Sequence, residues 1–330
     1  MRKIKIAQIG ISANSHGRHV FKSIEKQKDI FEIVGYALPE NEAEKFPEQV
    51  KCLEPYRQMT VEEILADKSI EAVTIETEEI YLTKYALMAA TAGKHIHMEK
   101  PGGINLADFE QLITIMKKTG KVFHTGYMYR YNPYVKQILS RIKAGELGEI
   151  VSVEAQMNCY HLREVRQWLD NFPGGMMFFL GCHLVDLVLQ IMGTPEKIVP
   201  FNKCTNADNV TAIDYGFAVF EYKNGVAFVK THASEFGGFI RRQLVVTGTK
   251  GTIELKPFEI LQNDVQYTDK TEYHDADWHT PGLTSRSDAY DRYDDMLSSF
   301  ASMVCGDKIN PYTLDYELNL YKTILAACGD

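Results

Sequence analysis

The fold is indicated by the stretch Ile4-Lys-Ile-Ala-Gln-Ile9-Gly10-Ile-Ser12-Ala-Asn-Ser15-His-Gly17. Apolar and polar residues alternate up to Ile9, which is typical of a β-strand, and a turn begins at Gly10. In the dinucleotide-binding motif GxGxxG the first glycine permits a tight turn, and the second lets the backbone approach a pyrophosphate. Gly10 takes the first position here, Ser12 the second and Ser15 the third. A strand before this turn and a helical pattern after it predict a phosphate-binding turn.

Short β-rich runs alternate with helical patterns over residues 1–125. The expected strands are 4–9, 32–37, 72–75, 95–98 and 122–125. Between them, Thr60 and Glu63 have the spacing of a capping box, and Asn105 can cap a helix over 106–119 that stops at Gly120. Strands that alternate with helices predict a doubly wound parallel sheet of the Rossmann type, which binds ligands at the carboxyl ends of its strands.

From residue 126 onward the β-rich runs become longer. They cover 150–158, 215–222, 226–233, 243–247 and 252–256, and Asn224-Gly225 predicts a hairpin between the second and the third. Helical patterns cover about 179–192, 289–305 and 313–327. We therefore predict an α/β protein with a Rossmann domain over 1–125. The predicted second domain, 126–330, is an α+β domain with a large, mainly antiparallel open sheet, and its last helix can pack back on the first domain.

The composition argues against several functions. The chain has 330 residues, a net charge of −8 and no long basic run, so we expect no nucleic-acid partner. Six scattered cysteines without a CxxC pair favour reduced thiols in the cytoplasm and no metal site. The first residues lack the apolar segment of a signal peptide. The apolar stretch 174–193 contains His183 and Asp186, so we expect a buried helix there and no membrane span.

The most specific signal is Glu99-Lys100-Pro101, at the carboxyl end of the strand predicted over 95–98. This motif closely resembles the Gfo/Idh/MocA family, that is, glucose–fructose oxidoreductase, inositol dehydrogenase and their relatives. Further segments resemble the family in the same order along the chain: 74–77 with Thr77, Gly126-Tyr-Met-Tyr-Arg130-Tyr-Asn-Pro133, Gly145–Glu149, Gly174-Gly175 to His183 and Asp186, and 246–252.

The resemblance implies oxidation of a secondary alcohol on a sugar, a polyol or a related small polyhydroxylated substrate, with hydride passing to NAD or NADP. That chemistry needs a proton acceptor and a cation that steadies negative charge. The resemblance assigns these catalytic roles to His183 and Lys100. The residues expected to bind the cofactor are Gly10, Ser12, Ser15, Thr77, Glu99, Lys100 and Pro101. Those expected to contact substrate are Arg130, Tyr160, His161 and Phe179.

One position departs from the family pattern. The family's catalytic aspartate falls on Phe179, four residues before His183, and Asp186 is a possible substitute. This departure keeps two alternatives open: a protein that binds dinucleotide and ligand without turnover, and a lyase or glycosidase that uses the cofactor transiently. His183 as an ordinary buried histidine, and Arg130 in a surface salt bridge, are the alternatives for single residues.

The choice of nucleotide and the assembly state depend on weaker signals. The second strand ends in Tyr36-Ala-Leu-Pro-Glu40, so the carboxylate that usually holds the adenosine ribose is absent or displaced to Glu40. No basic residue stands in that segment to receive a 2′-phosphate, which favours NAD over NADP. An open antiparallel sheet leaves one face uncovered, so we expect a homodimer or homotetramer formed through the second domain.

Overall fold

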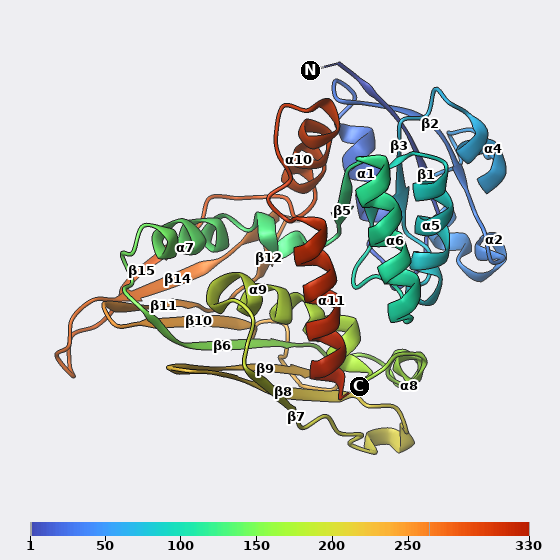
Figure 1. Cartoon of the computed structure of the whole chain (residues 1–330). Helices are drawn as coiled ribbons and strands as arrows, with labels where there is room; N and C mark the ends of the chain where they lie inside the picture. Colours follow the sequence, from blue (N-terminus) through green and yellow to red (C-terminus); the bar gives the residue numbers. More distant parts are fainter. Residues whose placement is uncertain (1, 264, 330) are drawn as a thin grey trace. The chain divides into compact units, whose positions relative to one another are not determined.

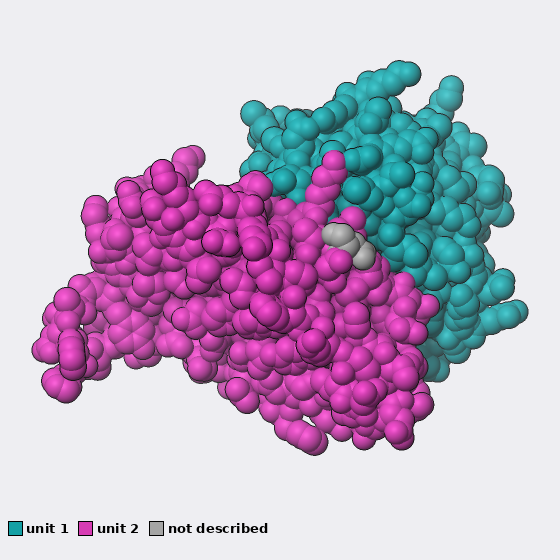
Figure 2. Space-filling model, turned by 60° about the horizontal axis from the view of Figure 1, so that its bottom comes forward, with its two compact units in different colours: residues 1–128, 293–321 teal, residues 129–292, 322–330 magenta. Residues whose placement is uncertain are grey.

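The computed structural model describes residues 2–263 and 265–329. Figure 1 shows the whole chain, and Figure 2 distinguishes its two compact units. Unit 1 contains Met1–Met128 and Tyr293–Tyr321, and unit 2 contains Tyr129–Arg292 and Lys322–Asp330. No helix among the described residues is long and apolar enough to cross a membrane.

Unit 1 is built on a five-stranded parallel sheet with the strand order β2-β1-β3-β4-β5. The strands are β1 (Ile4–Ile9), β2 (Phe31–Ala37), β3 (Ala72–Ile75), β4 (His95–Met98) and β5 (Phe123–Thr125). All five coincide with the predicted strands to within one residue. The order reverses beside β1, and the crevice at such a reversal is where open α/β sheets bind ligands. The predicted Rossmann fold is thereby confirmed.

Helices connect these strands. They are α1 (Gly17–Lys26), α2 (Glu42–Lys45), α3 (Pro47–Val50), α4 (Val61–Ala66), α5 (Leu82–Thr91) and α6 (Leu106–Thr119). The capping box of Thr60 and Glu63 is present, and Asn105 accepts hydrogen bonds from the first turn of α6. Gly120 ends α6 with φ 65°, as its position in the sequence predicts.

Two later segments complete unit 1. Helix α10 (Asp294–Cys305) packs against α1, where the Ser23 hydroxyl donates a hydrogen bond to Asp294. The predicted helix over 289–305 therefore begins five residues late. The first half of α11 (Leu314–Cys328) also belongs to unit 1, where the Tyr321 ring stacks on Phe109 at 4.4 Å.

Unit 2 contains an eight-stranded sheet with the order β15-β14-β11-β10-β6-β9-β8-β7. Its strands are β6 (Ile150–Asn158), β7 (Lys197–Pro200), β8 (Tyr215–Tyr222), β9 (Gly225–His232), β10 (Gln243–Gly248), β11 (Gly251–Leu255), β14 (Asp269–Tyr273) and β15 (Leu283–Arg286). A separate hairpin joins β12 (Ile260–Gln262) and β13 (Val265–Tyr267). The predicted open sheet is confirmed, with one parallel pair, β6–β9, among antiparallel neighbours.

Unit 2 also contains helices. They are α7 (Pro133–Lys143), α8 (Arg163–Trp168) and α9 (Cys182–Met192). The apolar stretch 174–193 contains a π-helical turn, Met177–Gly181, and then α9, which packs on β6 and β9. Asp186, on α9, is buried and forms an ion pair with Arg130. The stretch is therefore a buried helix of unit 2, as predicted.

Candidate active site

The turn after β1 has the tight geometry that the sequence predicts for Gly10. Its φ is 87°, a conformation that L side chains rarely adopt. A Cβ atom at Gly10 would lie 2.5–2.7 Å from atoms of Thr77, including its backbone nitrogen and Cα. Thr77 is itself fully buried. Gly10 and Thr77 therefore pack directly against each other at the carboxyl ends of β1 and β3.

The two serines of the turn hold it against the end of β3. The Ser12 N–H and the Ser15 hydroxyl donate to the same acceptor, the backbone oxygen of Glu76, at 3.0 and 3.1 Å. Helix α1 begins only at Gly17, where a Cβ atom would lie 2.8 Å from the Cβ of Glu76. Gly17 thus has the role of the third glycine, a close approach of helix to sheet, which we had assigned to Ser15.

Glu99 and Lys100 follow β4 and are both almost fully buried. A Glu99 carboxylate oxygen lies 3.7 Å from the Lys100 ammonium, and both oxygens lie 3.2 Å from Nδ1 of His16. Burial raises the pKa of the Glu99 carboxyl, but the His16 imidazole and the Lys100 ammonium outweigh burial and hold that pKa well below its usual range. The Glu99 carboxylate therefore lies between the His16 imidazole and the Lys100 ammonium at the carboxyl edge of the sheet.

Three further carboxyl groups, which no motif in the sequence indicates, are buried around this edge. Glu42 accepts a hydrogen bond from the Ile11 N–H at 2.9 Å, and its other oxygen has no partner among the described residues. Both oxygens of Glu76 and of Glu79 are buried without a hydrogen bond to any residue that the structure describes. Burial raises the pKa of Glu42 to about 8 and that of Glu79 to about 7, and it raises the pKa of Glu76 well above its usual range.

These raised pKa values predict that stability falls as pH rises. Between pH 4.5 and about 7 the native Glu79 holds a proton that the unfolded chain has released, so raising the pH favours unfolding. Glu79→Gln should therefore unfold with a larger free energy than the wild type at pH 8, by roughly 1–3 kcal/mol, and with little difference near pH 4.5. Urea denaturation across this range measures the effect. The exposed Glu44→Gln is the control, and parallel pH curves for Glu79→Gln and wild type would contradict the prediction.

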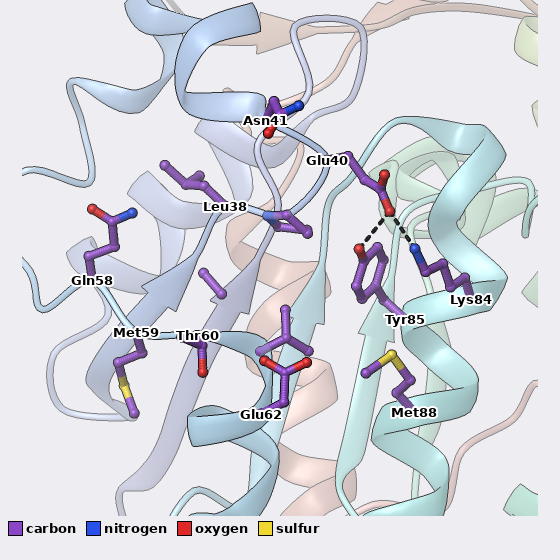
Figure 3. A pocket seen from close by; sticks show the side chains of 13 residues that line it. Leu38, Glu40, Asn41, Gln58, Met59, Thr60, Glu62, Lys84, Tyr85 and Met88 are labelled. Carbon is purple, nitrogen blue, oxygen red and sulfur yellow. Dashed lines mark hydrogen bonds and ion pairs between the residues drawn. The ribbon is translucent and has the colours of Figure 1, made fainter.

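A pocket of about 600 Å³ in unit 1 extends from the carboxyl end of β2. Figure 3 shows Glu40 at its rim, where one carboxylate oxygen accepts from Lys84 at 2.5 Å and from the Tyr85 hydroxyl at 2.7 Å. These two hydrogen bonds hold the pKa of Glu40 below its usual value. A basic residue therefore does stand beside this strand end, contrary to our expectation. Lys84 comes from α5, far along the sequence, so the local segment could not indicate it.

His183 lies on α9 in unit 2 and is 1% exposed. The ring of Tyr129 meets it edge-on, with 4.9 Å between centroids. The Tyr129 hydroxyl donates to the buried Glu259 at 2.6 Å and accepts from Arg242 at 3.1 Å. Glu259 also pairs with Arg292, and both arginines help to hold its pKa below the usual value despite burial. No local motif indicates this cluster, because its members are far apart along the chain.

Phe179 belongs to a group of aromatic side chains in the same unit. Its ring meets Trp168 edge-on at 5.2 Å, stacks on Phe172 at 6.2 Å and lies 6.4 Å from His161. Burial, with a contribution from nearby arginines, lowers the pKa of His161. Tyr160 is 49% exposed and contacts Phe236. Phe179 is therefore an apolar side chain in an aromatic group, inside a π-helical turn of the kind often found at functional sites.

Arg130 and Asp186 form a buried ion pair. Two guanidinium nitrogens of Arg130 donate to the two oxygens of Asp186 at 3.0 and 2.7 Å, and Gln190 donates to the same carboxylate. Both side chains are about 1% exposed or less, so this is no surface salt bridge. A bidentate buried pair fixes both groups strongly. Asp186 is thus engaged with Arg130, and this weakens its case as a substitute for the missing carboxylate.

Two polar side chains at the carboxyl ends of the parallel strands β6 and β9 are buried without a hydrogen bond to another described residue. They are the amide of Asn158, at the end of β6, and the hydroxyl of Thr231, on the neighbouring β9. Buried polar groups are normally paired, so such orphans indicate a missing partner. Hydroxyl groups of a ligand would supply donors and acceptors for both.

The predicted site residues fall into two sets. Unit 1 brings together Gly10, Ser12, Ser15, Thr77, Glu99, Lys100 and Pro101 at the carboxyl edge of its sheet, while unit 2 contains Arg130, Tyr160, His161, Phe179 and His183. The first set surrounds a turn that is suited to a nucleotide. The second set combines a buried imidazole with aromatic and polar side chains.

Known proteins resemble this chain over both units. Residues 4–127 match the oxidoreductase family with an NAD-binding Rossmann fold, and residues 135–254 match the GFO/IDH/MocA C-terminal domain. A candidate NADPH-dependent oxidoreductase from Desulfitobacterium hafniense has the same fold, with a TM-score of 0.83, 20% identity, and coverage of 100% of this chain and 95% of the other.

Two curated relatives have named activities. Trans-1,2-dihydrobenzene-1,2-diol dehydrogenase of Bos taurus is 26% identical, over 59% of this chain and 57% of its own length. The NADP(+)-dependent scyllo-inositol 2-dehydrogenase of Bacillus subtilis is 26% identical, over 54% of this chain and 49% of its own. The chain thus spans about half the length of these relatives. Together with the two family matches and the geometry of the turn after β1, these likenesses show that the chain belongs to the Gfo/Idh/MocA family of NAD(P)-binding oxidoreductases.

Proposed function

We propose that the protein oxidises a secondary alcohol on a sugar, polyol or related small polyhydroxylated substrate, with NAD or NADP as hydride acceptor. The observation that carries this proposal is Lys100, an ammonium group buried beside the Glu99 carboxylate at the carboxyl end of β4. The carboxyl edge of a doubly wound sheet is where a dinucleotide binds. The named relatives support a hydroxyl-bearing substrate, since one is a diol dehydrogenase and the other an inositol dehydrogenase.

The residues of unit 1 fit a dinucleotide. Gly10 and Gly17 keep the turn close to the sheet, because a Cβ atom at either position would collide with residues of β3's carboxyl end. The unpaired oxygen of Glu42 offers an acceptor for a ribose hydroxyl. In this proposal Gly10, Ser12, Ser15, Thr77, Glu99, Lys100 and Pro101 hold the nucleotide. When bound, the nicotinamide supplies the hydride acceptor.

Residues of the chain itself would stabilise the developing charge and accept the proton of the substrate hydroxyl. The Lys100 ammonium stabilises the negative charge that develops on the substrate oxygen, and His183 accepts the hydroxyl proton at a ring nitrogen. Arg130, Tyr160, His161 and Phe179 contribute to the substrate site in this scheme, Arg130 by fixing Asp186 on the helix that carries His183. The unpaired Asn158 and Thr231 provide further partners for substrate hydroxyls.

The pocket at Glu40 bears on the choice of nucleotide. The Glu40 carboxylate neutralises Lys84 and would repel a 2′-phosphate, so we propose that NAD binds more tightly than NADP. Glu40→Ala should weaken NAD binding only mildly and strengthen NADP binding by about tenfold, because Lys84 is released to pair with the phosphate. Titration calorimetry measures both dissociation constants, which we expect in the micromolar range.

A matched control for that substitution lines the same pocket. Glu62→Ala removes a carboxylate that has no ion pair with any described residue, so the ratio of NAD to NADP affinity of this variant should stay close to that of wild type. If Glu40→Ala and Glu62→Ala shift the ratio equally, Glu40 has no special role. If neither nucleotide binds at millimolar concentration, the oxidoreductase proposal is wrong.

Phe179 favours a second candidate, a family member that binds dinucleotide and ligand without turnover. The residue four positions before His183 is Phe179, which packs among aromatic side chains, so no carboxylate lies at that position. Incubation with NAD and a panel of sugars and polyols separates the candidates through the absorbance of reduced nicotinamide. Turnover supports the dehydrogenase, whereas binding without reduction of the cofactor supports the second candidate.

We further propose a homodimer or homotetramer formed through the sheet of unit 2. Phe217 and Phe228 stack at 5.7 Å on neighbouring strands β8 and β9, and both are only half buried. Phe201, after β7, lies 6.1 Å from Phe217 and is 50% exposed. Such an apolar face is suited to burial against a second copy. Sedimentation should show a dimer or tetramer, and Phe217→Lys should shift it toward monomer.

A further inference from the structure

The donors that a Rossmann turn usually offers to phosphate are largely engaged within this chain. The Ser12 N–H donates to the Glu76 carbonyl, the Asn14 N–H to the Ser12 hydroxyl and the Gly17 N–H to the Ser15 hydroxyl. The turn is also longer than the usual motif, since α1 begins only at Gly17. A side-chain donor from this segment would therefore add to the backbone N–H groups of the turn that are not engaged in this way.

His16 is the ionisable side chain in that position. Its Nδ1 lies 3.2 Å from both oxygens of Glu99, and its Nε2 has no hydrogen bond to any described residue. The imidazole is 24% exposed, whereas Glu99 is 1% exposed. A buried carboxylate on one ring nitrogen orients the ring and leaves the other nitrogen available to a ligand.

The charges around His16 favour an anion at Nε2 once the ring is protonated. Glu99 and Lys100 face it from the end of β4, and their charges offset each other. Glu76 lies close behind Gly17, and burial, together with the neighbouring Glu99 and Glu79 carboxyls, raises its pKa well above the usual range. From the segment before α10, the Tyr293 ring lies 5.7 Å from the imidazole. The His16 imidazole can therefore change its charge beside the turn, as can Glu42, whose carboxylate accepts from the Ile11 N–H.

We propose that His16 is an ionisable contact for the phosphates of the dinucleotide, holding Glu99 at Nδ1 and donating from Nε2 to a phosphate oxygen. This inference rests on the proposed dinucleotide site. The imidazolium then stands between two anions, the Glu99 carboxylate and the phosphate, and charge-assisted hydrogen bonds to both stabilise the protonated ring. Nucleotide binding at mildly alkaline pH is consequently accompanied by uptake of a proton from the buffer, and affinity decreases as the pH rises.

Calorimetry of the full-length protein with NAD tests this linkage. Titrations at pH 8 in two buffers of different ionisation enthalpy give the number of protons taken up on binding. We expect a fraction of one proton for wild type, falling toward zero at pH 6, and a dissociation constant about tenfold weaker at pH 9 than at pH 6. His16→Gln, which can still donate to Glu99 but cannot be protonated, should lose most of both effects.

His19→Gln is the matched control, because His19 lies in the first turn of α1, three residues after His16, and stacks on the same Tyr293 ring at 5.5 Å. It should behave like wild type. Equal proton uptake in wild type and His16→Gln would overturn the proposal and point to the buried carboxyls Glu42 and Glu79. Absence of uptake in wild type would overturn it as well. Failure of both NAD and NADP to bind would instead refute the dinucleotide site, and this inference with it.

A measurement on the wild type alone keeps the proposal testable if His16→Gln does not fold. The ring nitrogen resonances of His16 at pH 8 should change from a singly protonated imidazole to a doubly protonated one when NAD is added. An unchanged singly protonated ring in the saturated complex would overturn the proposal.

Discussion

Lys100→Met should lower turnover by about 10²-fold or more while the protein stays folded. The Lys100 side chain is 2% exposed and its ammonium lies 3.7 Å from Glu99, so the charge acts in a site with little water to screen it. Methionine has a similar length but no charge, and the oxygen of the reacting alcohol would lose its cationic partner. Steady-state rates of nicotinamide reduction, with the best substrate from a sugar and polyol panel, measure the loss.

The same unit offers a matched control. Lys94 is also buried, but it precedes β4, at the opposite end of that strand from Lys100, and donates to the backbone oxygens of Asp67 and Ile70. Lys94→Met should reduce stability, because it leaves two carbonyls unpaired, and leave turnover nearly unchanged in the folded protein. If folded Lys100→Met turns over as fast as wild type, Lys100 has no part in the chemistry.

His183→Ala should lower turnover by about 10²–10⁴-fold, the usual range for loss of a general base. His183 is held on the buried helix α9 against the Tyr129 ring, so its position is well defined. The rate should also lose the fall at low pH that protonation of the base produces. His232→Ala, on β9 of the same unit, is the control and should keep both rate and profile. Equal rates and one shared profile for wild type and His183→Ala would make His183 structural.

Phe179→Asp examines the departure from the family pattern within the same experiment. A carboxylate four residues before His183 can favour its protonated form and shift the rate profile toward higher pH. The new carboxylate would, however, enter the aromatic group of Trp168 and Phe172, where an unpaired charge costs stability. Turnover and thermal unfolding should therefore be measured together. An unchanged profile in a folded variant would show that residue 179 does not act on the base.

Local sequence determined most of the secondary structure. The strands 72–75, 95–98, 150–158 and 215–222 coincide with β3, β4, β6 and β8, and the caps at Thr60 and Asn105 form as their spacing predicts. These features depend on alternation, capping and turn chemistry within a few residues, which the chain carries locally. The helix predicted over 289–305 begins only at Asp294 in the structure. Residues 289–293 have the residue spacing of a helix but do not form one.

Local sequence also indicated Lys100 and the turn at Gly10, because short motifs at the ends of predicted strands identify the carboxyl edge of a parallel sheet. Only the tertiary structure decided what surrounds them. The pairing of His16 with Glu99, of Lys84 with Glu40 and of Tyr129 with Glu259 joins residues that are many positions apart. The raised pKa values of Glu42 and Glu79 have the same origin, since burial and the charges brought nearby by folding set the ionisation of a carboxyl group.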